Sequence, residues 1–267
     1  MFRTALASLA LVTALAACSS PQQQQRTRMA QMAERTLDRM DVLAPRADPG
    51  LVAATDIAFA RAARDRDLLS AMREYAAAGA VRHAGKGALD LETSLLGHPP
   101  VPKAERWAPN AVWSSCNGRF AVSFGKFRTP EGIMGTYATL WQRQSDRSIP
   151  YKWSYRIAAR DARQPAPRPA LEDLAGEDVI VVEELTAINA RTADCAPSGA
   201  GDMPPPPMRE FPATSVVHTG LADDRTLSWS WEHRADGTRI FKADYLREGV
   251  WEEVVNLTVA DAGVLSS

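Results

Sequence analysis

The sequence has little excess charge, few cysteines and no long apolar run. Its 267 residues carry 31 lysines and arginines against 32 aspartates and glutamates, which gives a net charge of −1. A surface without a strong excess of one sign does not attract polyanions, so we expect no nucleic-acid partner. The four histidines and three cysteines show no His-x-x-x-His or Cys-x-x-Cys spacing. We therefore expect no metal site.

Known catalytic and nucleotide-binding signatures are missing as well. The sequence contains no Gly-x-Gly-x-x-Gly or Walker phosphate loop and no Gly-x-Ser-x-Gly serine elbow. These patterns place a backbone against phosphate or expose a nucleophile, so their absence leaves no signature of a cofactor or of an activated serine. The apolar run at 5–14 is shorter than the roughly 20 residues that a bilayer-spanning helix needs. We expect no cofactor, and the missing catalytic motifs favour a protein that is not an enzyme.

The first 18 residues combine a basic start, a short apolar run and a cysteine. Arg3 precedes the run at 5–14, and the small residues of Leu15-Ala16-Ala17 come directly before Cys18. This segment resembles a bacterial lipoprotein signal, with an ordinary secretory signal as the alternative. The resemblance implies that residues 1–17 are removed and that Cys18 is acylated and inserted into a lipid bilayer. Ser19, in place of aspartate, implies transfer to the outer membrane, with the protein facing the periplasm.

Two cysteines remain once Cys18 is acylated. Cys116 and Cys195 would then lie in an oxidising compartment, where a disulfide is the expected state. Two unpaired buried thiols are the alternative. A bridge would close a loop of about 80 residues, which chain-entropy arguments value at roughly 4 kcal/mol.

Composition divides the chain into four parts. Residues 1–17 are the expected signal peptide, and residues 18–47 form a glutamine-rich tether with a short helix. A folded domain is expected over 48–160, because Asp48-Pro49 combines a good N-cap with a proline at the first helical position. Residues 161–267 contain proline-rich linkers and a C-terminal β extension.

Periodicity predicts helices first and strands afterwards. Apolar residues recur at helical spacing after Asp48 and again after Asp67, and a third helix is predicted near residue 90. Alternation then predicts strands, and Asn117-Gly118 predicts a tight hairpin. The predicted helices are 51–64, 68–76 and 89–96, and the predicted strands are 80–83, 111–115, 119–128, 136–144, 151–159, 179–188, 227–233, 240–245 and 250–259.

Several short phrases in this region are similar to those of a known superfamily. They are Phe59-Ala60-Arg61-Ala62-Ala63, Met72-Arg73-Glu74-Tyr75, Trp107-Ala108-Pro109, Ala121-Val122-Ser123-Phe124-Gly125, the run from Gly135 to Gln144, and Lys152-Trp153. With them, residues 51–159 resemble the SnoaL-like, nuclear transport factor two-like proteins. The resemblance implies an α+β fold in which helices pack in the concave face of a strongly bent antiparallel sheet, forming a cone. A C-terminal antiparallel β extension would follow this cone.

The resemblance also implies a mostly apolar pocket at the open end of the cone. The expected lining residues are Phe59, His83, Tyr137, Trp141 and Trp153. Phe59 falls where steroid isomerases of the superfamily place a tyrosine, and His83 falls near their catalytic aspartate. Because phenylalanine has no proton to donate, an oxyanion donor is missing. The aromatic residues can equally form an ordinary core, and His83 can be a hydrogen-bonded histidine at a strand end.

Three functional hypotheses follow. The favoured one is an outer-membrane lipoprotein whose periplasmic domain is a non-catalytic module for binding a small molecule or for protein interaction. The second is a cofactor-free lyase or isomerase in which His83 is the base, helped by Tyr137 or Asp90. The third is a structural scaffold of the envelope that uses a sheet edge or the proline loops. The superfamily resemblance adds a homodimer formed through the outer face of the sheet.

Overall fold

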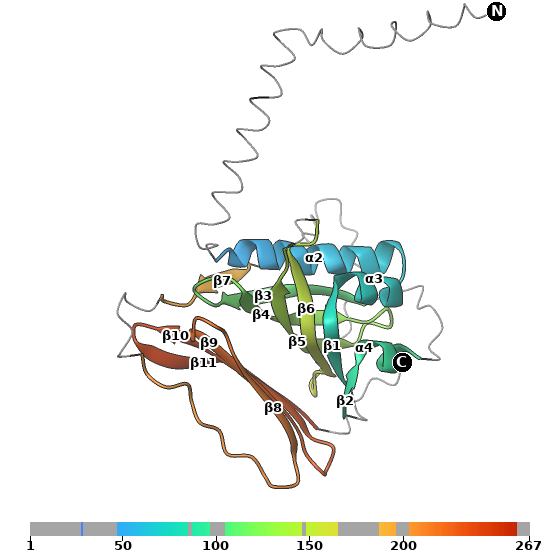
Figure 1. Ribbon diagram of the computed structural model, residues 1–267. Coiled ribbons are helices and arrows are strands. Elements are labelled where there is room, and N and C mark those ends of the chain that lie inside the picture. The colour runs from blue at the N-terminus through green and yellow to red at the C-terminus, as the bar shows by residue number, and fades with distance from the viewer. Residues whose placement is uncertain are drawn as a thin grey trace, which may run out of the picture. The chain divides into compact units, whose positions relative to one another are not determined.

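The computed structural model describes residue 28 and residues 47–84, 87–96, 105–145, 148–164, 187–195 and 203–260 (Figure 1). Apart from Arg28, all of them belong to the compact unit Arg46–Ser267. The expected signal peptide, Cys18 and nearly all of the tether lie outside the described residues, as does most of the strand predicted at 179–188. None of the described helices has the length and apolar character needed to cross a membrane.

The unit is built mainly of β-strands in two sheets. A seven-stranded sheet has the order β2-β1-β6-β5-β4-β3-β7, and a four-stranded sheet has the order β11-β10-β9-β8. The helices are α2 (Pro49–Asp65), α3 (Leu68–Tyr75) and α4 (Leu91–Leu95). The strands are β1 (Ala76–Ala84), β2 (Gly87–Asp90), β3 (Arg106–Ser114), β4 (Phe120–Arg128), β5 (Met134–Arg143), β6 (Tyr151–Arg160), β7 (Asn189–Thr192), β8 (Val216–Leu221), β9 (Leu227–His233), β10 (Arg239–Arg247) and β11 (Val250–Val259).

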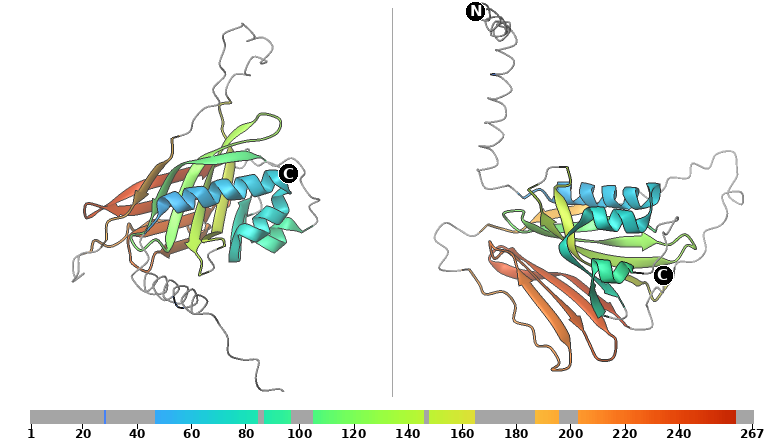
Figure 2. Two further views of the ribbon diagram at one scale, coloured as in Figure 1. Left: turned by 90° about the horizontal axis from the view of Figure 1, so that it is seen from above. Right: turned by 45° about the vertical axis from the view of Figure 1, so that its right-hand side comes forward.

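The predicted fold class, an α+β cone with an antiparallel sheet, is wrong. Strands make up 50% of the structure and helices 18%. The large sheet is mixed, because β1 runs parallel to β6 and β7 runs parallel to β3. Its second face is covered by the four-stranded sheet, so the C-terminal strands supply a whole layer (Figure 2). Strand periodicity showed which residues share a face but carried no information on this pairing.

Aspartate caps explain where α2, α3 and α4 begin. The carboxylate of Asp48 accepts a hydrogen bond from the Leu51 amide at 2.9 Å. Asp67 accepts one from the Ser70 amide at 2.8 Å, and Asp90 accepts one from the Thr93 amide at 3.0 Å. Each cap satisfies an amide that would otherwise lack a partner in the first turn.

The seven-stranded sheet separates two apolar cores. On one face α2, α3 and α4 pack around Phe59, Trp107 and Trp141. On the other face Tyr155 and Phe241 belong to the core between the sheets. The view in Figure 2, right, shows helices, large sheet and small sheet as successive layers. The sheet is therefore buried on both sides.

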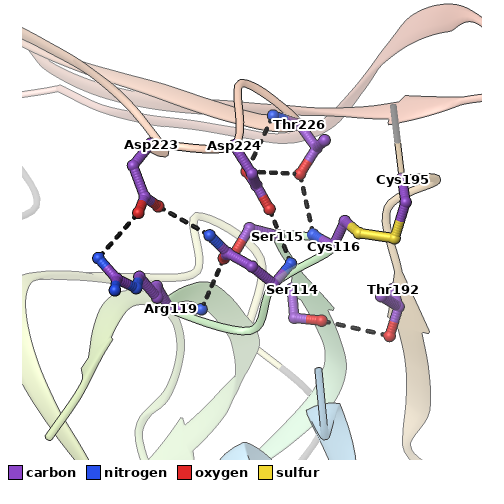
Figure 3. The surroundings of a disulfide bond; sticks show 10 residues. Ser114, Ser115, Cys116, Arg119, Thr192, Cys195, Asp223, Asp224 and Thr226 are labelled. Atoms are coloured by element: carbon purple, nitrogen blue, oxygen red, sulfur yellow. Dashed lines mark hydrogen bonds and ion pairs between the residues drawn. A yellow bond between two sulfur atoms is a disulfide. The ribbon is translucent and has the colours of Figure 1, made fainter. Parts of the chain in front are cut away.

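At one end of the unit, hydrogen bonds fasten the two sheets beside a disulfide that joins two neighbouring strands of the large sheet (Figure 3). Cys116, in the turn after β3, is bonded to Cys195 after β7, with the two Cα atoms 5.0 Å apart. This is the pairing expected from the sequence. The amide of Cys116 also donates to the Thr226 hydroxyl at 2.9 Å, and the amide of Asn117 donates to Asp224 at 2.7 Å. The predicted Asn117-Gly118 turn is therefore a docking point between the sheets.

Candidate functional site

A small cavity lies at the side of the seven-stranded sheet, next to α3 and the start of β3. Its volume is about 90 Å³. Leu68 and Met72 of α3 and Trp107 of β3 give it an apolar wall, whereas most of the remaining lining is charged or polar. The full lining is Leu68, Met72, Arg82, His83, Ala84, Glu105, Trp107, Arg156, Ala158 and Arg239.

Two arginines stand side by side in this cavity. Arg82 on β1 and Arg156 on β6 are direct partners in the pairing of the two strands. Directly paired residues present their side chains on the same face of a sheet, and two like charges placed in this way repel each other. Burial lowers the pKa of Arg82, the charge of Glu105 raises it, and the charge of Arg156 lowers it further. The strand pairing therefore concentrates positive charge on one wall.

Glu105 is the acidic residue of the lining. Burial raises the pKa of its carboxyl group, while the charges of Arg156 and Arg82 lower it. One carboxylate thus faces three lining guanidinium groups, those of Arg82, Arg156 and Arg239. The lining of the cavity therefore carries more basic than acidic side chains.

Arg156 is held firmly by its surroundings. Its Nη1 donates a hydrogen bond to the Thr139 hydroxyl at 2.7 Å. Its guanidinium carbon lies 4.8 Å from the ring centre of Trp107, 4.6 Å from that of Tyr137 and 5.5 Å from that of Phe59. Desolvated cation–π contacts of this kind contribute up to about 2 kcal/mol each. The side chain is therefore fixed in place before any ligand arrives.

A buried aspartate stands behind this arginine. Asp56 of α2 is fully buried and accepts hydrogen bonds from the Trp107 indole at 2.9 Å, the Ser123 hydroxyl at 2.7 Å and the Tyr137 hydroxyl at 2.8 Å. Burial raises the pKa of this carboxyl group, and the charge of Arg156 with the three hydrogen bonds lowers it. Asp56 does not line the cavity. Its role is to orient Trp107 and Tyr137, the rings that hold Arg156.

His83 lines the cavity and also contacts the four-stranded sheet. Its Nδ1 is 2.7 Å from the Tyr155 hydroxyl and its Nε2 is 3.1 Å from Nδ1 of His233. Burial, together with the charges of His233 and Arg239, lowers the pKa of His83 to about 3. The imidazole is therefore neutral at pH 7, and both ring nitrogens already have partners. It is poorly suited to act as a base on a ligand in the cavity.

The predicted pocket residues do not gather around one opening. His83 lines the cavity, whereas Phe59 and Tyr137 lie one layer behind it as contacts of Arg156. Trp141 and Trp153 are completely buried in the core under the helices. Asp90 caps α4, and its pKa is lowered by the hydrogen bonds with Thr93. The structure thus does not bring His83, Tyr137 and Asp90 together.

The residues that build this site were missed in the sequence. Asp56 lies four residues after Val52 and three before Phe59, on the buried stripe of α2. An acidic residue at a core position of an amphipathic helix is an unusual choice, because a buried charge is costly unless it is bonded. Arg156 similarly interrupts the buried pattern of β6. Both were visible signals, although neither indicates which side chains surround it.

Comparisons with protein families, with curated proteins and with solved structures find no match for this chain. The SnoaL-like resemblance therefore stays a prediction, and function has to be argued from the site itself. No group of three or more His, Cys, Asp or Glu side chains suited to a metal ion occurs within the described part of the chain.

Proposed function

We propose that this chain is an outer-membrane lipoprotein, anchored through acylated Cys18, whose folded unit binds a small carboxylate in the cavity beside α3. The observation that carries the proposal is the side-by-side placement of Arg82 and Arg156 on the wall of that cavity. A negatively charged ligand would be attracted by both guanidinium groups and would offset their mutual repulsion.

Charge and shape both favour a carboxylate. A guanidinium group offers parallel N–H donors that match the two oxygens of a carboxylate. A carboxylate bound between Arg82 and Arg156 would therefore offset the repulsion between their charges. The apolar wall of Leu68, Met72 and Trp107 can cover a short aliphatic part of the ligand. A volume of about 90 Å³ leaves room for a small molecule only. The ligand is therefore an acid of a few carbon atoms.

Binding without catalysis fits the remaining side chains. Three groups that could transfer a proton, His83, Tyr137 and Asp56, already have hydrogen-bond partners within the protein. The fourth, Glu105, lines the cavity, and burial raises the pKa of its carboxyl group. A lyase or isomerase would need a second free group to act with Glu105 on the ligand, and none of the other three is free. The site therefore supports recognition better than the lyase or isomerase chemistry.

Calorimetry with acetate, propionate, butyrate and succinate tests the ligand class, with the matching alcohols and amides as neutral probes. The carboxylates should bind and the neutral probes should not. Arg82→Met should weaken carboxylate binding by about tenfold or more, because a charged hydrogen bond contributes about 1.5–3 kcal/mol. Arg61→Met, on the exposed surface of α2, is the matched control and should bind as the parent does.

The stability of the same variant separates a binding role from a structural one. Without ligand, Arg82→Met should unfold at nearly the same temperature as the parent, because it removes a buried charge and the repulsion by Arg156 together with the attraction by Glu105. Equal binding of carboxylates and alcohols, or a folded protein that binds none of the acids, would overturn the ligand assignment. The anchor is tested by Cys18→Ala, which should move the protein from the membrane fraction to the soluble fraction.

A further inference from the structure

Within the residues that the structure describes, the two sheets have four edges, which differ in how far they are protected against pairing with another strand. Natural edge strands are usually short, charged, bulged or interrupted by proline, because an open edge otherwise invites a new strand. β2 and β7 are only four residues long. β11 carries Glu252 and Glu253 and contains a bulge in its pairing with β10. These three edges follow the rule.

β8 does not follow it. Its six residues, Val-Val-His-Thr-Gly-Leu, include no lysine, arginine, aspartate, glutamate or proline. Its pairing with β9 is continuous, without a register shift. Val216 is 62% exposed and Leu221 is 38% exposed, although both are large apolar residues. β8 is thus a regular, uncharged and partly apolar edge that faces solvent.

The backbone of β8 is also fixed by its contacts with β9. Gly220 lies over the ring of Trp229, so close that an added Cβ would be 2.2 Å from the ring. A groove of about 430 Å³ separates Pro206, Pro207 and Phe211 from the outer face of β8 and β9. The proline-rich segment therefore lies across this groove from β8, and within the described part of the chain no strand pairs with the free edge of β8. An incoming strand would meet a backbone that is already ordered.

We propose that β8 pairs antiparallel with β8 of a second copy of this chain, across a two-fold axis, so that the two small sheets join into one continuous sheet. With the axis at Thr219, Thr219 of one copy lies opposite Thr219 of the other. Val217 of each copy then lies opposite Leu221 of the other, on the same outer face. On the inner face, His218 lies opposite Gly220, so the imidazole ring meets no opposing side chain.

The chemistry of β8 fits a second copy better than an unrelated strand. A two-fold interface places each residue near its own counterpart, so a charge close to the axis would be repelled by itself. β8 carries no Lys, Arg, Asp or Glu that would cause this repulsion. Threonine opposite threonine and valine opposite leucine are both favourable cross-strand pairs. The strand is therefore complementary to itself in this register.

A cross-linking experiment with the full chain tests the register. Paired residues in an antiparallel sheet have Cα atoms about 4.5–5.5 Å apart, within the range that a disulfide spans. Under mild oxidation, Thr219→Cys should therefore shift on a non-reducing gel from the mass of one chain to that of two. Thr258→Cys, at an exposed position of the opposite edge strand β11, is the matched control and should stay at the mass of one chain.

A second variant keeps the test independent of cysteine chemistry. Leu221→Lys places a charge opposite Val217 of the other copy, so the uncross-linked protein in detergent should change from dimer to monomer in analytical ultracentrifugation. Circular dichroism should show that its fold is retained. If Thr219→Cys gives no more dimer than Thr258→Cys, the proposal is overturned. An adduct of Thr219→Cys with a different protein would also overturn it, because another partner would then occupy the edge.

Discussion

Acidification should destabilise this protein through His83. The histidine is only 3% exposed, and its pKa in the folded state is about 3, against about 6.5 for a free histidine. As the pH falls below about 6.5, His83 becomes protonated in the unfolded chain, whereas in the folded chain it stays neutral until the pH approaches 3. The stability that neutral His83 contributes is therefore complete above this window and is lost progressively within it.

The size of the effect follows from the two pKa values. Protonation of a histidine with a pKa of about 6.5 stabilises the unfolded chain by about 2 kcal/mol at pH 5, while the folded chain gains almost nothing. At pH 3 the difference approaches about 4–5 kcal/mol, because each pH unit corresponds to about 1.4 kcal/mol. A domain of this size has a stability of about 5–15 kcal/mol, so a loss of about 2 kcal/mol is readily measured.

Urea unfolding at several pH values between 8 and 5 measures this loss. Asp56 and Glu105 contribute in the opposite direction, because burial raises the pKa values of their carboxyl groups. The comparison is therefore made between the parent protein and His83→Asn, in which these carboxyl groups are retained. The parent should lose about 2 kcal/mol more than His83→Asn between pH 8 and pH 5.

His218→Asn is the matched control, because His218 lies on the exposed strand β8. Its stability should depend on pH as that of the parent does. If His83→Asn and the parent lose stability equally between pH 8 and pH 5, His83 is not held neutral by its burial, and the reasoning fails.

Three further predictions concern the core and the disulfide. Asp56→Asn should lower the free energy of unfolding by about 2–4 kcal/mol in urea titrations, because Arg156 loses the nearby charge and three donors lose a charged acceptor; an unchanged midpoint would contradict this. Cys116→Ser should cost about 4 kcal/mol by the same assay, and added reductant should then have no further effect. Gly135→Ala should lower the melting temperature in calorimetry, because its Cβ would lie 2.1 Å from the Phe127 ring, whereas Gly50→Ala, with only the Asp48 side chain nearby, should not.

Local structure was largely predictable from the sequence. The Asp48-Pro49 start of α2, the helix after Asp67 and the Asn117-Gly118 turn all depend on residues within a few positions of one another. Caps and tight turns follow from such local chemistry. Most strands after residue 106 also followed from alternation, although their ends shifted by a few residues, whereas β7 and β8 were not predicted.

The arrangement of the strands and the candidate site were not predictable in the same way. β1 pairs in parallel with β6, about 75 residues away along the chain. Helical or strand periodicity cannot identify such a partner. Arg82 and Arg156 belong to no motif in the sequence, and only this pairing places them side by side. The candidate site is a product of topology, and a resemblance in short phrases had directed attention to His83 and the tryptophans instead.

One extra residue in β6 lets this strand contribute large side chains to both hydrophobic cores. Ser154 is the additional residue where Trp141 pairs with Trp153 and Leu140 pairs with Tyr155. Because of it, Trp153 enters the layer beneath the helices and Tyr155 enters the layer between the sheets. Since both cores include side chains of β6, unfolding of either core disturbs a strand that also belongs to the other. Amide protons on both sides of β6 should accordingly exchange in a single cooperative event, and the molecule should lack a half-folded form in which one layer survives alone.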